Sequence, residues 1–198
     1  MKKEKSESIL ETAGRMFARY GLNKTSIDEI ARLARVAKAT IYNYFGSKDR
    51  VYLEVLKKEV DELIGKISRS VIRERLTEKK LAAYVKARFL YMSQVLNIMN
   101  LEWEGFEKKP PEARIIRNDL FEREVQLISS ILNEGMENGL FHLNDALLAA
   151  RAICHAFRGF DQEGLFQENT EKIDNYLDEL IRIIFSGLRV RTKISSQF

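Results

Sequence analysis

Residues 26–50 read SIDEIARLARVAKATIYNYFGSKDR, and their pattern predicts the fold of the N-terminal part of the chain. Ser26 precedes an apolar run and Glu29 follows three residues later, which is the capping-box spacing of a helix start. The pattern predicts one short helix after Ser26 and a second from Lys38 to Phe45, separated by a turn at residues 35–37. Helices this short are not stable alone in water. Two of them crossing on a third element form a helix-turn-helix unit, which places its second helix in the major groove of DNA.

A family resemblance rests on residues 31–48, ARLARVAKATIYNYFGSK. This string resembles the N-terminal signature of TetR-type bacterial transcriptional regulators, which runs roughly A-x-x-A-G-V-S-x-G-T-[IL]-Y-x-[YH]-F-x-[ST]-K. It departs from the signature at Arg35 and Ala39, where the family has Gly, and at Ala37, where it has Ser. Arg35 must therefore either adopt a positive φ or find another path through the turn. Ala37 removes an N-cap hydroxyl from the second short helix.

The resemblance implies an all-α chain with two domains. Residues 1–50 are expected to form a three-helix DNA-binding domain of the helix-turn-helix type. Residues 51–198 are expected to form a helical domain that binds a small effector and makes a homodimer through its last two helices. The expected partners are a double-stranded, palindromic DNA operator and an effector of unknown identity.

The DNA-contacting residues are predicted from their position and chemistry. Lys48 and the amides at the start of its helix suit a phosphate, since the helix dipole and the ammonium group act together there. The hydroxyls of Thr40 and Tyr42 suit phosphates or base edges, whereas Lys38 can read guanine or neutralise a phosphate. For Tyr42 and Tyr44, the alternative is packing against the neighbouring helix. The complete predicted set is Thr25, Ser26, Lys38, Thr40, Tyr42, Tyr44 and Lys48.

Composition and charge agree with a DNA-binding helical protein. The chain has 198 residues, of which 45% are hydrophobic and 31% charged, and its two prolines leave few helix breaks. Residues 1–50 hold 11 Lys/Arg and 6 Asp/Glu, so the positive net charge lies in the segment expected to touch phosphates. No apolar run follows the charged N-terminus and none approaches the length of a membrane span. We therefore expect a cytoplasmic protein without a membrane partner.

Apolar periodicity predicts helices through the rest of the chain. A first helix carries the stripe from Ile9 to Tyr20 and stops at Gly21, and Ser47 caps a long helix that joins the two domains. The later helices are expected to run from Thr77 to about Trp103, from Pro111 to Gly139, from Asp145 to about Phe160 with Asn144 as cap, and from Glu171 to about Val190. The tail from Arg191 is expected to fray.

The two final helices are predicted to form the homodimer interface. Residues 146–160 leave little polar surface, so this helix must be buried on several sides. Small residues such as Ala149, Ala152 and Ala156 allow close approach of a second helix. The alternative is that this helix forms the core of a monomer.

The effector site implied by the resemblance lies in the C-terminal domain. Bulky apolar residues at helical spacing are its candidate lining, although residues of this kind are usually core, and they indicate an apolar or amphipathic effector. These residues are Phe89, Met92, Met99, Trp103, Phe106, Phe121 and Phe157. The effector can release DNA only if it prefers a dimer geometry in which the two reading helices no longer match successive major grooves. The reading helix of each copy is the second helix of its helix-turn-helix unit, residues 38–45. One alternative is a regulator controlled by a protein partner, or one without a small-molecule ligand.

Catalysis and metal or cofactor binding are not predicted. His142 and His155 lack companion ligands at metal spacing. Cys154, the single cysteine, is expected to be a small buried hydrophobic residue rather than a redox sensor. An enzyme with an added N-terminal domain would need a convergent set of titratable residues in the C-terminal half, and the sequence has none.

Overall fold

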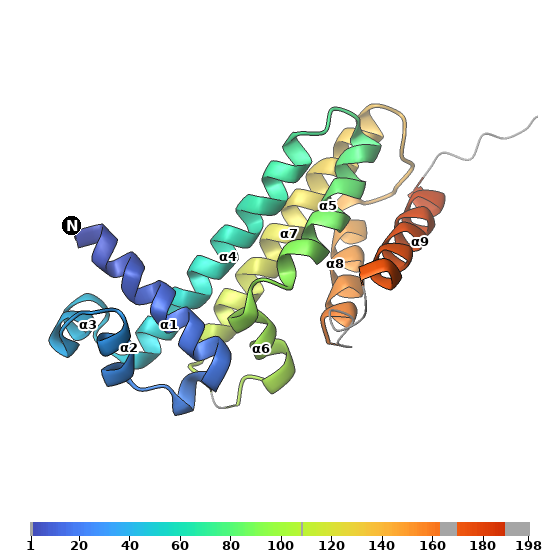
Figure 1. Ribbon diagram of the computed structural model, residues 1–198. Coiled ribbons are helices and arrows are strands. Elements are labelled where there is room, and N and C mark those ends of the chain that lie inside the picture. Colours follow the sequence, from blue (N-terminus) through green and yellow to red (C-terminus); the bar gives the residue numbers. More distant parts are fainter. Residues whose placement is uncertain (1, 108, 163–169, 189–198) are drawn as a thin grey trace, which may run out of the picture. The chain divides into compact units, whose positions relative to one another are not determined.

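A computed structural model describes residues 2–107, 109–162 and 170–188, which form α-helices joined by turns, without a β-strand among them (Figure 1). The predicted all-α fold is thereby confirmed. The described helices are α1 (Lys2–Lys24), α2 (Ile27–Leu33), α3 (Lys38–Phe45), α4 (Lys48–Ile72), α5 (Thr77–Met92), α6 (Leu96–Glu104), α7 (Glu112–Glu137), α8 (Ala146–Gln162) and α9 (Thr170–Leu188). None of the described helices is long and apolar enough to span a bilayer.

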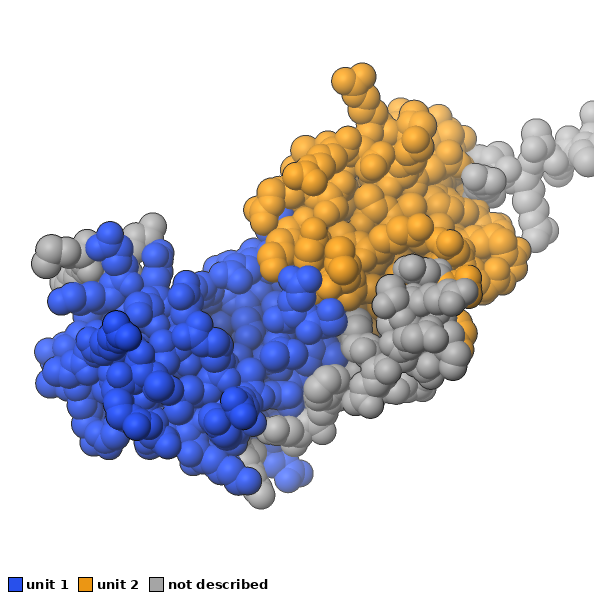
Figure 2. All heavy atoms as spheres, in the orientation of Figure 1, with its two compact units in different colours: residues 1–65, 92–120 blue, residues 66–91, 121–198 orange. Residues whose placement is uncertain are grey.

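The chain divides into two compact units, coloured separately in Figure 2. The first unit comprises residues 1–65 and 92–120, and the second comprises residues 66–91 and 121–198. Helices α4 and α7 contribute residues to both units because each crosses a boundary. These units are defined by packing. The predicted division by function, into a DNA-binding domain of residues 1–50 and an effector-binding domain of residues 51–198, stays a prediction.

The core of the first unit holds α2 and α3 against α1 and α4. Its central side chains are at most 1% exposed, and they are those of Ile9, Phe17, Ile30 and Ile41. The ring of Phe17 meets that of Tyr52 edge to face, with centroids 5.2 Å apart. Burial of such side chains stabilises the unit by roughly 1.5–3 kcal/mol each, which short helices need because their own hydrogen bonds are insufficient.

Gly21 breaks the regular helix of α1 and Gly139 follows the end of α7, as predicted. Gly21 adopts φ 78° and ψ 162° within α1, so the regular helix breaks there, although helical residues continue to Lys24. Gly139 follows α7 with φ 68°. Both values of φ lie in the region that favours glycine.

The predicted single helix from Thr77 to about Trp103 is wrong, because two helices occupy this segment. Helix α5 ends at Met92 and α6 begins at Leu96. A carboxylate from α4 stabilises the new helix start. Glu59 Oε2 accepts a hydrogen bond from Ile98 N (3.0 Å), and its Oε1 accepts from Asn97 N (3.3 Å) and Nδ2 (2.6 Å). The first amides of a helix need such partners, and sequence periodicity does not reveal a partner that lies 38 residues away.

The cap of α8 also differs from the prediction. The helix begins at Ala146, and Asp145 Oδ1 accepts a hydrogen bond from Leu148 N (2.9 Å). Asp145 therefore takes the capping role that was predicted for Asn144. The predicted frayed tail lies outside the described residues.

Candidate functional site

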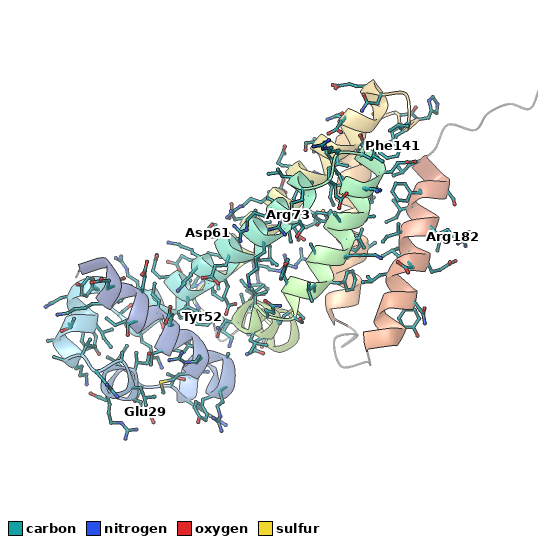
Figure 3. The ribbon with its side chains drawn as sticks, turned by 45° about the horizontal axis from the view of Figure 1, so that its top comes forward. Glu29, Tyr52, Asp61, Arg73, Phe141 and Arg182 are labelled. Atoms are coloured by element: carbon teal, nitrogen blue, oxygen red, sulfur yellow. The ribbon has the colours of Figure 1, made fainter. Side chains whose placement is uncertain are left out.

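The start of α2 is held by a complete capping box, which confirms the role predicted for Ser26. Ser26 Oγ accepts from Glu29 N at 3.2 Å, and Ser26 N donates to Glu29 Oε2 at 3.1 Å. Glu29, labelled in Figure 3, also accepts the Ser26 hydroxyl proton. These hydrogen bonds from Ser26 lower the pKa of the exposed Glu29 carboxyl. These reciprocal hydrogen bonds satisfy two backbone amides at the start of α2. Helices α2 and α3 together form the helix-turn-helix, called here the reading unit.

Arg35 turns the chain between α2 and α3 through the left-handed region. Its φ is 55°, and it is the non-glycine residue with positive φ among the described residues. Val36 N donates to Ala31 O at 3.0 Å and closes the turn after α2. The sequence left open whether Arg35 adopts a positive φ or another conformation, and in the structure it adopts the strained, positive φ.

Replacing Arg35 with Gly is expected to raise the free energy of unfolding by about 1 kcal/mol, since glycine adopts positive φ without steric cost. Arg35→Ala is the control, because it removes the same charge and keeps a Cβ. We expect the Ala variant to gain nothing in urea denaturation. Equal stability of the two variants would show that the left-handed turn carries no strain.

Helix α3 carries polar and aromatic residues on two sides, with Lys38 and Tyr42 on one and Thr40 and Tyr44 on the other. Ile41 is 1% exposed and anchors the helix in the core. Tyr42 is 45% exposed, and Lys38 is also exposed, whereas Thr40 and Tyr44 are half-buried. The ring of Tyr44 lies against that of Phe45 at 6.1 Å. The structure thus brings four of the predicted DNA-binding residues together on one short helix.

Charge at the start of α3 is partly paired. Lys38 Nζ lies 2.9 Å from Asp28 Oδ2, and this hydrogen bond raises the pKa of the Lys38 ammonium. Both side chains are at least half exposed, so the pair is weak and a phosphate can compete for the lysine. Ala37 makes no side-chain cap, as its lack of a hydroxyl predicted.

Lys48 and Thr25 hold the end of α1. Lys48 Nζ donates to Leu22 O (2.9 Å) and Thr25 O (3.1 Å), which leaves one of its three protons for a phosphate. Thr25 is 2% exposed and its hydroxyl donates to Gly21 O at 2.8 Å. The buried Thr25 side chain therefore positions the turn after α1. The last carbonyl groups of a helix have no partner within the helix, so side-chain donors such as Lys48 and Thr25 are expected near its end.

Helix α6 is tied to α1 by two asparagines that sequence reasoning missed. Asn97 Nδ2 donates to Gly14 O at 3.1 Å, and Asn100 Nδ2 donates to Ala18 O at 3.2 Å. The Asn97 side chain also donates a hydrogen bond to Glu59 Oε1. Burial raises the pKa of the Glu59 carboxyl. Together these contacts hold α6 to the helix that supports α2 and α3.

The predicted effector-lining residues fall into both compact units. Met92 and Met99 are buried in the first unit, where Phe106 is half-buried, and the Trp103 side chain lies outside the described residues. In the second unit the buried rings of Phe89 and Phe157 meet edge to face at 5.9 Å.

Phe121, the remaining predicted residue, is buried in the second unit beneath the His155 ring at 4.7 Å. Cys154 is buried, as predicted. Two open surface pockets of about 290 Å³ and 320 Å³ are lined by none of the predicted residues.

A buried polar cluster lies beside Phe89 and Phe157. The Arg88 and Glu124 side chains are 0% and 2% exposed, and Arg88 Nε donates to Glu124 Oε1 at 2.6 Å. Tyr84, fully buried, donates its hydroxyl to the same oxygen at 2.9 Å. Burial, followed by the charge of Glu124, raises the pKa of Tyr84 well above its usual value, so the phenol stays protonated. Arg88 and Glu124 were not among the predicted residues, because charged residues in a helical pattern ordinarily face solvent.

Comparison with known proteins supports the DNA-binding assignment. Residues 9–55 match the family model described as bacterial regulatory proteins of the tetR family. The fatty acid metabolism regulator protein of Bacillus subtilis is 23% identical over 138 residues, which cover 70% of this chain and 71% of the relative.

Solved structures share the fold. FadR from Bacillus subtilis, in complex with stearoyl-CoA, superposes with a TM-score of 0.74 at 20% identity, covering 91% of this chain and 98% of that one. AibR, in complex with isovaleryl coenzyme A and operator DNA, superposes with a TM-score of 0.67 at 17% identity, covering 91% of this chain and 98% of that one.

Proposed function

This chain belongs to the TetR family of bacterial transcriptional regulators, and we propose that it is a repressor that binds a palindromic operator as a dimer and leaves it when an amphipathic effector binds. The observation that carries the proposal is the capped α2–α3 unit, which offers Lys38 and Tyr42 on the exposed face of α3. A short helix of this kind suits the major groove.

The proposed DNA contacts divide by chemistry. Lys38, the remaining proton of Lys48 and the backbone near Thr25 and Ser26 face phosphates, whereas Thr40, Tyr42 and Tyr44 face the groove. Phosphate contacts set position and affinity, and groove contacts set sequence preference. Operator affinity should therefore fall steeply with salt.

Dimerisation is proposed through α8 and α9, because each of them exposes large apolar residues among its surface residues. On α8, Leu148 is 66% exposed and is followed at helical spacing by the exposed Ala152, Ala156 and Gly159. On α9, Ile183 is 56% exposed. A second copy would cover both faces and supply the second reading helix that a palindrome requires.

The effector is proposed to be an acyl compound, either a fatty acid or its coenzyme A thioester. Two observations support this class. Phe89 and Phe157 bring apolar aromatic rings together in the second unit, and the similar proteins FadR and AibR are in complex with stearoyl-CoA and isovaleryl coenzyme A. Release follows if the effector prefers a dimer geometry that does not fit the operator.

Selection of random DNA fragments by the purified protein, followed by footprinting across a salt series, tests the proposed function. We expect a two-fold symmetric site whose affinity decreases with salt. Absence of any enriched site at low salt would contradict operator binding.

Replacing Tyr42 with Ala is expected to weaken operator binding by about 10- to 100-fold, because each reading helix loses a groove contact. Tyr20→Ala is the matched control, since Tyr20 is similarly exposed, at 50%, but lies on α1. Fluorescence anisotropy with the selected site measures both variants. Equal losses in the two would remove Tyr42 from the reading surface.

A further inference from the structure

The Arg88–Glu124 pair has the geometry of an occupied carboxylate receptor. Two donors, Arg88 Nε and the Tyr84 hydroxyl, converge on one oxygen of Glu124 at 2.6 and 2.9 Å. Aromatic rings form the walls, since the Arg88 guanidinium lies 5.2 Å from the centroid of Phe157 and 5.9 Å from that of Phe89. Arginine suits carboxylates because its planar guanidinium matches their geometry, and a dry site strengthens the attraction.

Stability alone does not explain this pair. Removing two charges from water is expensive, and the attraction between them commonly does no more than offset that loss. Apolar residues of similar volume fill such a position equally well or better. Arg88 on α5, Glu124 on α7 and Phe157 on α8 therefore place a cation among apolar rings where packing does not require one.

We propose that Arg88 and Tyr84 recognise the carboxylate of the effector, which takes the place of the Glu124 carboxylate. The effector is then an amphipathic carboxylic acid, with its apolar body among Phe89 and Phe157. This inference rests on the proposed function, and it selects the free acid over the thioester. The exchange preserves the contact between guanidinium and carboxylate, and it removes the buried bond between α5 and α7. Binding thereby changes how two helices of the second unit are held.

The probes are dodecanoate, dodecanol and dodecanoyl-CoA, which share one chain and differ in the head group. Calorimetry measures their binding to the full-length protein. In the wild type we expect dodecanoate to bind at least about 10-fold more tightly than dodecanol, because the alcohol makes no ion pair. In Arg88→Met/Glu124→Leu, an apolar substitution of the pair, the ratio should fall to about one.

Glu124→Gln is the second variant, and it serves if the double variant does not fold. It keeps the volume and a hydrogen-bond acceptor beside Tyr84 but removes the competing charge. Dodecanoate should therefore bind more tightly to this variant than to the wild type. The same affinity, or a weaker one, contradicts displacement of Glu124.

Other outcomes separate this inference from the proposed function. The inference is overturned if dodecanoate does not bind, if the double variant keeps the wild-type preference, or if dodecanoyl-CoA alone binds. Operator affinity without ligand is measured in parallel. If the operator is bound while the carboxylate preference is absent, only this inference fails. If the wild type binds no operator, the proposed function fails as well.

Discussion

Replacing Leu148 and Ile183 together with Glu is expected to convert the proposed dimer into a monomer and to lower operator affinity at least about 100-fold. Each Glu would place a charge in an apolar contact, next to the same charge of the second copy. A monomer has one reading helix, so it loses the gain from two linked binding events, which is commonly 10² to 10⁴. Sedimentation measures assembly, and anisotropy measures operator binding.

The control for this variant is Ile72→Glu/Leu90→Glu. Ile72 and Leu90 are similarly exposed, at 77% and 59%, but lie on α4 and α5. We expect this variant to remain dimeric and to keep its operator affinity. If the α8–α9 variant also sediments as two subunits, the interface lies elsewhere.

Replacing Gly135 with Ala is expected to destabilise the protein by about 2–4 kcal/mol, because the space is already filled. A Cβ at Gly135 would lie 2.0 Å from Cδ2 of Phe141, which is 3% exposed and is labelled in Figure 3. The ring lies directly on the backbone of α7, and Phe141 N also donates to Gly135 O at 3.1 Å. The ring must leave its site to admit a methyl group. Urea denaturation measures the loss.

Two comparisons sharpen the Gly135 experiment. Gly14→Ala in α1 is the matched control, since its Cβ would meet Val55 Cγ1 at 3.4 Å, and we expect a gain of about 0.5–1 kcal/mol from helix propensity. In a Phe141→Ala background, Gly135→Ala should no longer destabilise the protein. A loss that persists there would show that the clash with the ring is not the cause.

Local chemistry made the reading unit predictable. The capping box at Ser26, the bounds of α3 and the breaks at Gly21 and Gly139 depend on interactions within a few residues, and the structure confirms them. The break between α5 and α6 was not predictable in this way. Leu81, Val85 and Phe89 form an apolar stripe whose spacing Leu96 and Met99 extend in the sequence. The cap that starts α6 comes from Glu59 on another helix.

The all-α fold and the short helices α2 and α3 follow from the sequence, because helix periodicity and capping act over short distances. The resemblance to the TetR family rests on the motif at residues 31–48. Packing of distant segments brings Lys48 and Thr25 to the end of α1, Glu59 to the start of α6, and Arg88 to Glu124 in the second unit. These contacts join residues far apart in the chain. The chemistry of a charged side chain does not say whether it ends in water, on a carbonyl or in the core until packing has chosen its neighbours.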